Sequence, residues 1–101
     1  MKVRLFCNAG MSTSLLVNKI KDAAAAEGTE IDICAYPVSE IEERIQGIDV
    51  ALLGPQVGYL KAQVEPVCKA AGVPMDVIPM VDYGMCNGAN VLKFAKALAG
   101  K

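Results

Sequence analysis

The sequence predicts an α/β fold: a four-stranded parallel open sheet in the strand order 2-1-3-4, with helices on both faces. Short apolar runs typical of strands alternate along the chain with longer segments in which apolar residues recur at helical spacing. The run 50–53 is apolar without alternation, which is typical of a central strand covered on both faces. The second and fourth strands mix apolar with polar residues, which indicates edge strands.

Each element has its own local signals. Ser12 is the expected N-cap of the first helix, and Gly28 is expected to end that helix. A capping-box pattern at 39–42 predicts the start of a short second helix. Pro66 lies inside the third helical pattern and predicts a kink or two short helices. The expected strands are 2–7, 31–36, 49–53 and 74–78; the expected helical segments are 12–27, 39–45, 57–71 and 89–99, with a ten-residue loop at 79–88 before the last.

Length and composition predict one soluble domain spanning 1–101. The chain has 101 residues, of which 53% are apolar and 21% charged, enough for a core and a solvated surface. A net charge of −1 without a basic run gives no reason to expect nucleic-acid binding. No apolar run approaches the roughly 20 residues that span a bilayer, and the N-terminus enters a strand directly, so no signal peptide is expected. We therefore expect a cytoplasmic protein, and a monomer.

The cysteine and histidine content restricts the chemistry. Cys7, Cys34, Cys68 and Cys86 are widely spaced, with no Cys-x-x-Cys pair, so neither a disulfide framework nor a metal site is expected. The sequence contains no histidine, which excludes histidine-based acid–base catalysis and most zinc sites. No cofactor is expected. Chemistry in this chain must use cysteine, carboxylates, hydroxyls or the backbone.

Topology and residue type both indicate a site at Cys7. The chain reverses direction between the first and third strands, so a crevice is expected beyond the carboxyl ends of these strands. Cys7 ends the first strand, and Gly54-Pro55-Gln56 follows the third. A loop whose amides point inward, leading into a helix N-terminus, favours an anion and a thiolate. We expect phosphate to be held by the segment Asn8, Ala9, Gly10, Met11, Ser12, Thr13 and Ser14.

The residue six positions after Cys7 narrows the type of phosphate chemistry. Low-molecular-weight tyrosine phosphatases, which like flavodoxin-like proteins have this sheet order, carry an arginine there. This chain has Thr13. Without the guanidinium that grips phosphate and stabilises the transition state, fast hydrolysis of a phosphocysteine is not expected. A slowly hydrolysed phosphocysteine can instead pass its phosphoryl group to a second acceptor.

The run Phe6-Cys7-Asn8-Ala9-Gly10-Met11-Ser12-Thr13-Ser14-Leu15-Leu16-Val17 resembles the active loop of one family of sugar-transport proteins. This family is the IIB components of the phosphoenolpyruvate-dependent sugar phosphotransferase system, lactose/cellobiose/chitobiose group. The likeness continues through Leu52-Leu53-Gly54-Pro55-Gln56, Tyr59, Tyr83-Gly84 and Gly88…Val91-Leu92-Lys93, over essentially the whole chain.

The resemblance implies a cytoplasmic phosphocarrier with Cys7 as the phosphocysteine. Its phosphoryl group would come from a histidyl phosphate of a IIA partner. It would pass to a disaccharide of the cellobiose, lactose or chitobiose type, held by a membrane-embedded IIC partner at the inner face of the membrane. The expected docking residues round Cys7 are Met11, Pro55, Gln56 and Tyr83.

Two other classes of protein remain possible at this point. One is a low-molecular-weight phosphatase or arsenate-reductase-like enzyme, against which Thr13 argues. The other is a non-catalytic flavodoxin-like or receiver-like binding module. A receiver needs an aspartate at the end of the third strand, where Leu52-Leu53-Gly54 has none.

Overall fold

A computed structural model describes residues 1–8 and 11–100; of Met11 and Ser12 it describes the backbone alone. The elements in chain order are β1 (Lys2–Cys7), α1 (Met11–Glu27), β2 (Asp32–Pro37), the 3-10 helix η1 (Val38–Glu40), α2 (Ile41–Arg44), β3 (Val50–Leu53), the 3-10 helix η2 (Pro55–Leu60), α3 (Lys61–Ala70), β4 (Met75–Val77), α4 (Met80–Gly84) and α5 (Gly88–Leu98).

The sheet has the predicted topology. Its strands run parallel in the order β2-β1-β3-β4, and the register places Leu5 of β1 opposite Ala35 of β2 and Leu52 of β3. All four residues of β3 are buried, as the unbroken apolar run predicted. The predicted fold class is therefore confirmed.

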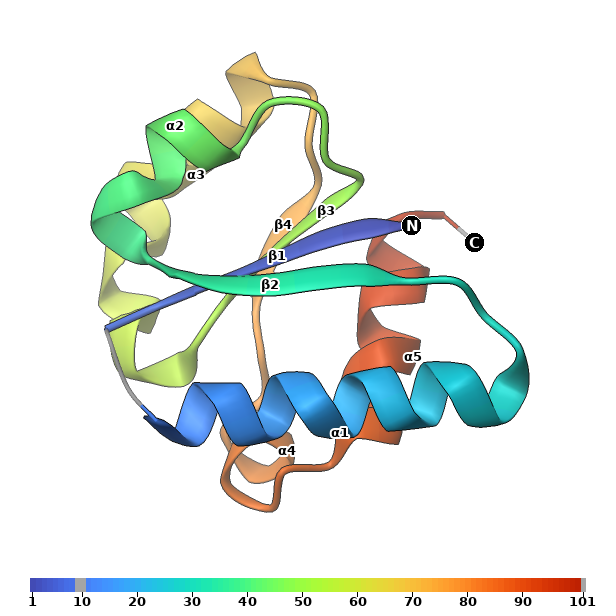
Figure 1. Cartoon of the computed structure of the whole chain (residues 1–101). Coiled ribbons are helices and arrows are strands. Elements are labelled where there is room, and N and C mark those ends of the chain that lie inside the picture. The colour runs from blue at the N-terminus through green and yellow to red at the C-terminus, as the bar shows by residue number, and fades with distance from the viewer. Residues whose placement is uncertain (9–10, 101) are drawn as a thin grey trace.

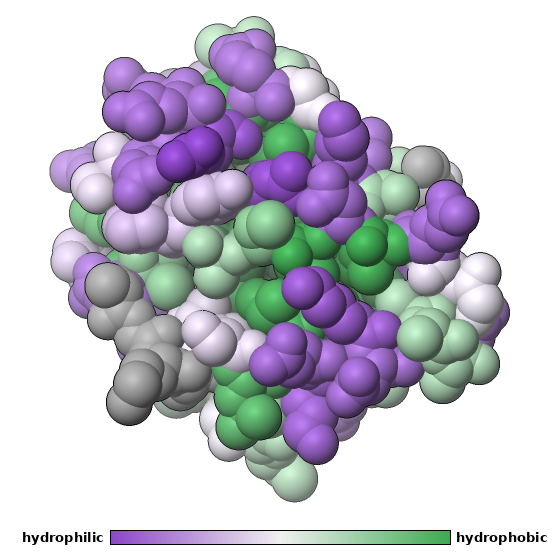
Figure 2. Space-filling view, in the orientation of Figure 1, coloured by the Kyte–Doolittle hydropathy of each residue, from purple (hydrophilic) through white to green (hydrophobic). Residues whose placement is uncertain are grey.

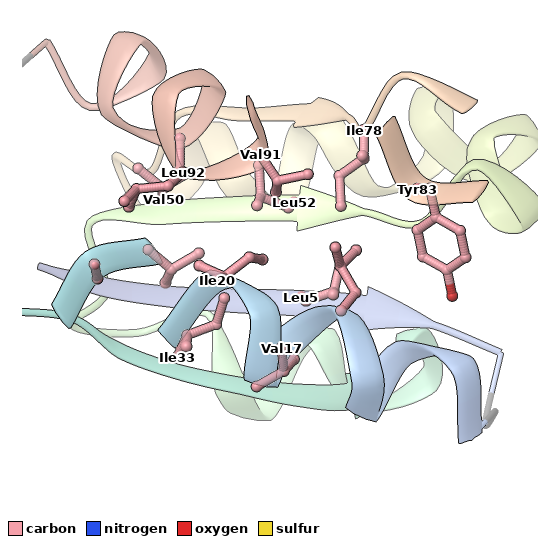
Figure 3. Close-up of a cluster of buried hydrophobic side chains, with 14 residues drawn as sticks. Leu5, Val17, Ile20, Ile33, Val50, Leu52, Ile78, Tyr83, Val91 and Leu92 are labelled. Atoms are coloured by element: carbon pink, nitrogen blue, oxygen red, sulfur yellow. The ribbon is translucent and has the colours of Figure 1, made fainter. Parts of the chain in front are cut away.

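Helices cover both faces of the sheet and create two cores (Figure 1). On one face α1 and α5 pack on the strands round Leu5, Ile20 and Leu52, together with Val91 and Leu92 (Figure 3). On the other face α2, η2 and α3 pack on Phe6, Ala51 and Leu53 in a second cluster. Side chains of one strand alternate between the two faces, so neighbours such as Leu5 and Phe6 belong to different cores.

The predicted end of the first helix is confirmed. Gly28 directly follows α1 and has φ 76°, the left-handed conformation in which glycine commonly ends a helix. No helix in the described part of the chain is long and apolar enough to cross a membrane.

Two predicted helix starts are wrong. The first helix already begins at Met11, so Ser12 lies in its first turn rather than at the cap. The capping box at Ser39 does not form, because Ser39 lies within η1, which follows directly from Pro37. A capping residue needs an extended backbone before the helix, and Glu40 at the start of α2 makes no side-chain cap.

Two other expectations need correction. The third helical segment does divide, but not at Pro66: the break separates η2 from α3 at Lys61, after Val57 leaves the helical region with φ −113° and ψ 18°. Pro66 lies inside α3, whose buried Val64 and Cys68 hold it against the sheet. The expected loop at 79–88 contains the short helix α4, which buries Tyr83 in the α1/α5 core.

Candidate functional site

Cys7 occupies the last position of β1, at the carboxyl end of a strand flanked by two others. Pro37 at the end of β2 lies opposite Cys7 in the register. On the other side, the Gly54 amide donates a hydrogen bond to the Phe6 carbonyl at 2.9 Å. The Cys7 residue is only 4% exposed. The thiol thus lies at the topological switch point, with the ends of both neighbouring strands beside it.

Gly54 leaves room for this arrangement. A Cβ at Gly54 would lie 3.4 Å from the Cys7 Cβ and 3.0 Å from Oε1 of Gln56. The turn Gly54-Pro55-Gln56 therefore packs directly against Cys7, in agreement with the expectation that the loops after the first and third strands meet.

Thr13 is the residue that contacts the thiol. Its hydroxyl lies 3.2 Å from Cys7 Sγ and is placed to donate a hydrogen bond to it. Thr13 is 2% exposed, a buried polar residue in the first turn of α1. A neutral hydroxyl thus occupies the position, six residues after the cysteine, at which low-molecular-weight tyrosine phosphatases carry an arginine.

Tyr83 extends the contact to α4, seventy residues away in the chain. Its hydroxyl lies 2.8 Å from the Thr13 hydroxyl. The ring is buried in the α1/α5 core, at the end where β1 stops and α1 begins, and its oxygen is directed towards that junction (Figure 3). Tyr83 is 7% exposed, so it offers a partner little surface. Its expected use as a docking residue stays a prediction, while its expected nearness to Cys7 is what the structure shows.

Of the other expected site residues, the structure describes some and not others. Ala9 and Gly10, expected to hold phosphate, lie outside the described residues, and so do the side chains of Met11 and Ser12. Asn8 and Gln56 are exposed, and Pro55 is half-buried. Their use in phosphate binding or docking stays a prediction.

Ser14 faces a different feature from Thr13. It is exposed and lines a groove of about 300 Å³ between α1 and the edge strand β2. Figure 2 shows hydrophobic surface across the middle of this face of the molecule. The groove is lined by Ser14, Val17, Asn18, Lys21, Ile33, Cys34 and Ala35.

Large exposed apolar side chains on α4 and η2 were not predicted as a group. Tyr59 on η2 is 76% exposed, and Met80, Val81 and Met85 in and after α4 are similarly exposed. The signal for them was weak, because 79–88 was expected to be an irregular loop without a defined outer face.

The segment that follows Cys7 has no basic residue, and the described residues form no metal-binding group. The segment 8–14 contains no lysine, arginine or histidine. Within the ranges 1–8 and 11–100, no group of three histidine, cysteine, aspartate or glutamate side chains could hold a metal ion. All four cysteines are free thiols. Among the described residues, the donor to Cys7 Sγ is the neutral hydroxyl of Thr13.

The fold and site together define a four-stranded parallel α/β protein with a buried cysteine at the switch point of its sheet, beside a helix N-terminus and a buried hydroxyl. Residues 2–94 match the family described as PTS system, Lactose/Cellobiose specific IIB subunit. The chain belongs to this family of the sugar phosphotransferase system.

Its similarity to individual proteins agrees with the family. The chain is 48% identical over 101 residues to the PTS system galactose-specific EIIB component of Lactococcus lactis subsp. cremoris, covering 95% of this chain and 94% of that protein. It is 36% identical over 97 residues to the oligo-beta-mannoside-specific EIIB component of Bacillus subtilis, with 96% and 94% covered.

Two solved structures share the fold. The cellobiose-specific IIB component protein of Borrelia burgdorferi, 36% identical, superposes with a TM-score of 0.82 over 99% of this chain and 92% of that one. The lactose-specific IIB component domain of Streptococcus pneumoniae gives a TM-score of 0.86, covering 97% of this chain and 96% of that one; at 16% identity it supports the fold alone.

Proposed function

We propose that this protein is a phosphocarrier that accepts a phosphoryl group on Cys7 from a histidyl phosphate of a IIA partner. It then transfers the group to a sugar held by a membrane-embedded IIC partner. The observation that carries the proposal is the placement of Cys7, with its sulfur 3.2 Å from the Thr13 hydroxyl at a helix start. Family membership supports the reaction class, since IIB components belong to a phosphotransferase system.

In the first step the thiolate of Cys7 supplies the electron pair of a new S–P bond. The N–P bond of the donor breaks, its electron pair stays on the imidazole of the partner, and in the net reaction that imidazole takes up the proton released by the thiol. Backbone amides at the start of α1 and the Thr13 hydroxyl are suited to the charge that develops on phosphoryl oxygens, since fixed donors need no reorganisation during transfer.

In the second step the S–P bond breaks and a sugar hydroxyl oxygen takes the phosphoryl group. The electron pair of the S–P bond returns to sulfur, and the proton of the sugar hydroxyl restores the thiol in the net reaction. Thr13 in place of arginine supports transfer over hydrolysis, because no cation in 8–14 fixes the phosphate or activates its attack by water. The absence of histidine from the sequence agrees with a donor histidine on the partner.

The substrate is proposed as a disaccharide of the cellobiose, lactose or chitobiose type. The names of the similar proteins include galactose, cellobiose and oligo-beta-mannoside. The proposed working location is the cytoplasm, at the inner face of the membrane while the protein is bound to IIC. We propose that the chain acts as a single domain and a monomer.

The docking surface is proposed round the end of β1. Pro55 and Gln56 lie in the turn that packs on Cys7, and Met11 is the first residue of α1. The exposed Tyr59 and Met80 add apolar surface of the kind that is enriched in protein interfaces.

The test is phosphorylation by purified IIA phosphorylated with labelled phosphate. The wild type and Cys34→Ser, a matched loss of a half-buried thiol, are expected to take the label. Cys7→Ser is expected to carry no thiophosphate. Equal labelling of Cys7→Ser, or label mapped to another residue, would refute the proposal. Turnover of an aryl phosphate by the isolated wild type would favour the phosphatase alternative.

A further inference from the structure

Three side chains from three elements form a hydrogen-bonded series that ends at the sulfur of Cys7. Tyr83 on α4 contacts Thr13 at 2.8 Å, and Thr13 on α1 contacts Cys7 at 3.2 Å. All three are buried. A hydrogen bond shielded from water is stronger than an exposed one, and successive bonds polarise one another.

Proton counting fixes the direction of the series. A threonine hydroxyl has one proton to donate. When Thr13 donates it to Cys7 Sγ, the bond between Thr13 and Tyr83 can exist only if the Tyr83 hydroxyl donates to the Thr13 oxygen. A thiolate is a better acceptor than a thiol, because hydrogen bonds to charged groups are roughly twice as strong as neutral ones. The order Tyr83 to Thr13 to Cys7 is therefore the one that accompanies the thiolate.

We infer that Tyr83 is a positioning residue that acts through Thr13 to favour the thiolate form of Cys7. The thiolate is the nucleophile in cysteine chemistry. The described neighbours of Cys7 are uncharged: Pro37 from β2, Gly54 from the turn after β3, and Thr13 from α1. Tyr83, one hydroxyl further away, is the other titratable group in this series besides Cys7. Neutral donors therefore have to supply the stabilisation that a cation would give elsewhere.

Apolar packing and hydrogen bonds between α4 and α5 hold Tyr83 in place. Its ring packs in the α1/α5 core, so its hydroxyl is delivered by apolar contacts. The Asn87 amide donates to the Asp82 carbonyl at 2.9 Å, and Asn90 Nδ2 donates to the Asp82 carboxylate at 3.1 Å. These bonds join α4 to the start of α5. The Tyr83 hydroxyl is thus preorganised, which is what a positioning role requires.

The inference rests on the proposed function only for its use in phosphoryl transfer; its effect on the thiol is measured without any partner. Tyr83→Phe keeps the ring and removes the hydroxyl. Thr13→Val removes the hydroxyl at similar volume, and Thr13→Ser is the conservative variant that keeps it. The readout is the rate of alkylation of Cys7 by iodoacetamide, resolved from the other cysteines by mass spectrometry, at pH 7 and at pH 9.5.

At pH 7 we expect alkylation about tenfold slower in Thr13→Val and about threefold slower in Tyr83→Phe, from the strength of a hydrogen bond to a charged group. At pH 9.5, where an ordinary thiol is largely ionised, the variants should react at nearly the wild-type rate. Thr13→Ser should retain most of the wild-type rate at both values. Because Tyr83 acts through Thr13, the double variant Thr13→Val/Tyr83→Phe should be no slower than Thr13→Val.

Three results would overturn the inference. They are an unchanged rate in Tyr83→Phe at pH 7, a loss of equal size at both pH values, which would indicate altered access, and additive losses in the double variant.

Cys68 reports on folding in the same digest: burial, and then the Glu65 carboxylate, raises the pKa of its thiol, so it reacts slowly unless the chain opens. If the variants show the predicted alkylation rates but the wild type takes no phosphate from IIA, the proposed function is refuted and this inference stands.

Discussion

Gly88 sets how closely α5 approaches α1, and replacing it with alanine is expected to separate the two helices. A Cβ at Gly88 would lie 2.3 Å from both the carbonyl carbon and the carbonyl oxygen of Lys19, and 2.6 Å from the amide nitrogen of Ile20. Ordinary contacts between carbon atoms lie at about 3.5–4.0 Å. The obstructing atoms are backbone atoms of α1, so no side-chain rotation relieves the clash.

The cost follows from the required movement. The start of α5 has to withdraw from α1 by about 1 Å or more, and a gap of 0.5–1 Å forfeits roughly a quarter to a half of the dispersion energy of the atoms that face it. Val91, Leu92 and Ala95, all buried against α1 and the sheet, lie on the helix that moves. Overpacked sites commonly lose about 1–3 kcal/mol. With backbone as the obstacle, we expect Gly88→Ala to lower the free energy of unfolding by about 3 kcal/mol.

Thermal and urea denaturation monitored by circular dichroism measure this loss. For a domain of this size, 1 kcal/mol corresponds to about 4–8 °C in Tm, so Tm should fall by roughly 12 °C or more. Gly84→Ala is the matched control: it lies at the end of α4 with no atom within 4 Å of the added Cβ, and its stability should stay within about 1 kcal/mol of the wild type. A fall in Tm of less than about 4 °C in Gly88→Ala would show that α5 withdraws freely, contrary to this reasoning.

Two further predictions concern single side chains that accept backbone hydrogen bonds, Asn87 and Asp76. Asn87 caps α5 by accepting a hydrogen bond from the Asn90 amide at 3.1 Å, so Asn87→Ala should cost about 1 kcal/mol in urea denaturation; no change in the midpoint would show that the cap is replaced. Burial raises the pKa of Asp76, but hydrogen bonds from the Val77 amide and from Lys61 at 3.0 Å outweigh it, so the net pKa is lowered. The stabilisation is therefore present above about pH 4, the ordinary pKa of an aspartate, and is lost as the pH falls through the lowered value. Denaturation between pH 2 and 7 should show a shallower acid loss in Asp76→Asn, and parallel curves would contradict this.

The architecture could be predicted because it depends on patterns that are local in the sequence. The unbroken apolar run of β3 requires burial on both faces, and Gly28 ends α1 through a conformation that other residues adopt at a cost. Cys7 at a strand end, followed by small residues and hydroxyls, was enough to indicate the site. The predicted capping box at Ser39 is wrong because Pro37 leads directly into η1, so Ser39 lies inside a 3-10 helix. The four-residue pattern 39–42 does not include Pro37 and so could not predict this.

The sequence by itself thus determined the sheet order and the two layers of helices, and it indicated Cys7 and Thr13 as the candidate site, since strand and helix periods and six-residue spacing are readable along the chain. Only the tertiary structure decided that the Tyr83 hydroxyl reaches Thr13 from inside the core. The sequence of residues 79–88 is typical of a loop, but the helix α4 forms there, with the Tyr83 ring buried against α1 and α5. A contact across seventy residues is set by how helices pack, and Gly88 controls that packing through the absence of a side chain.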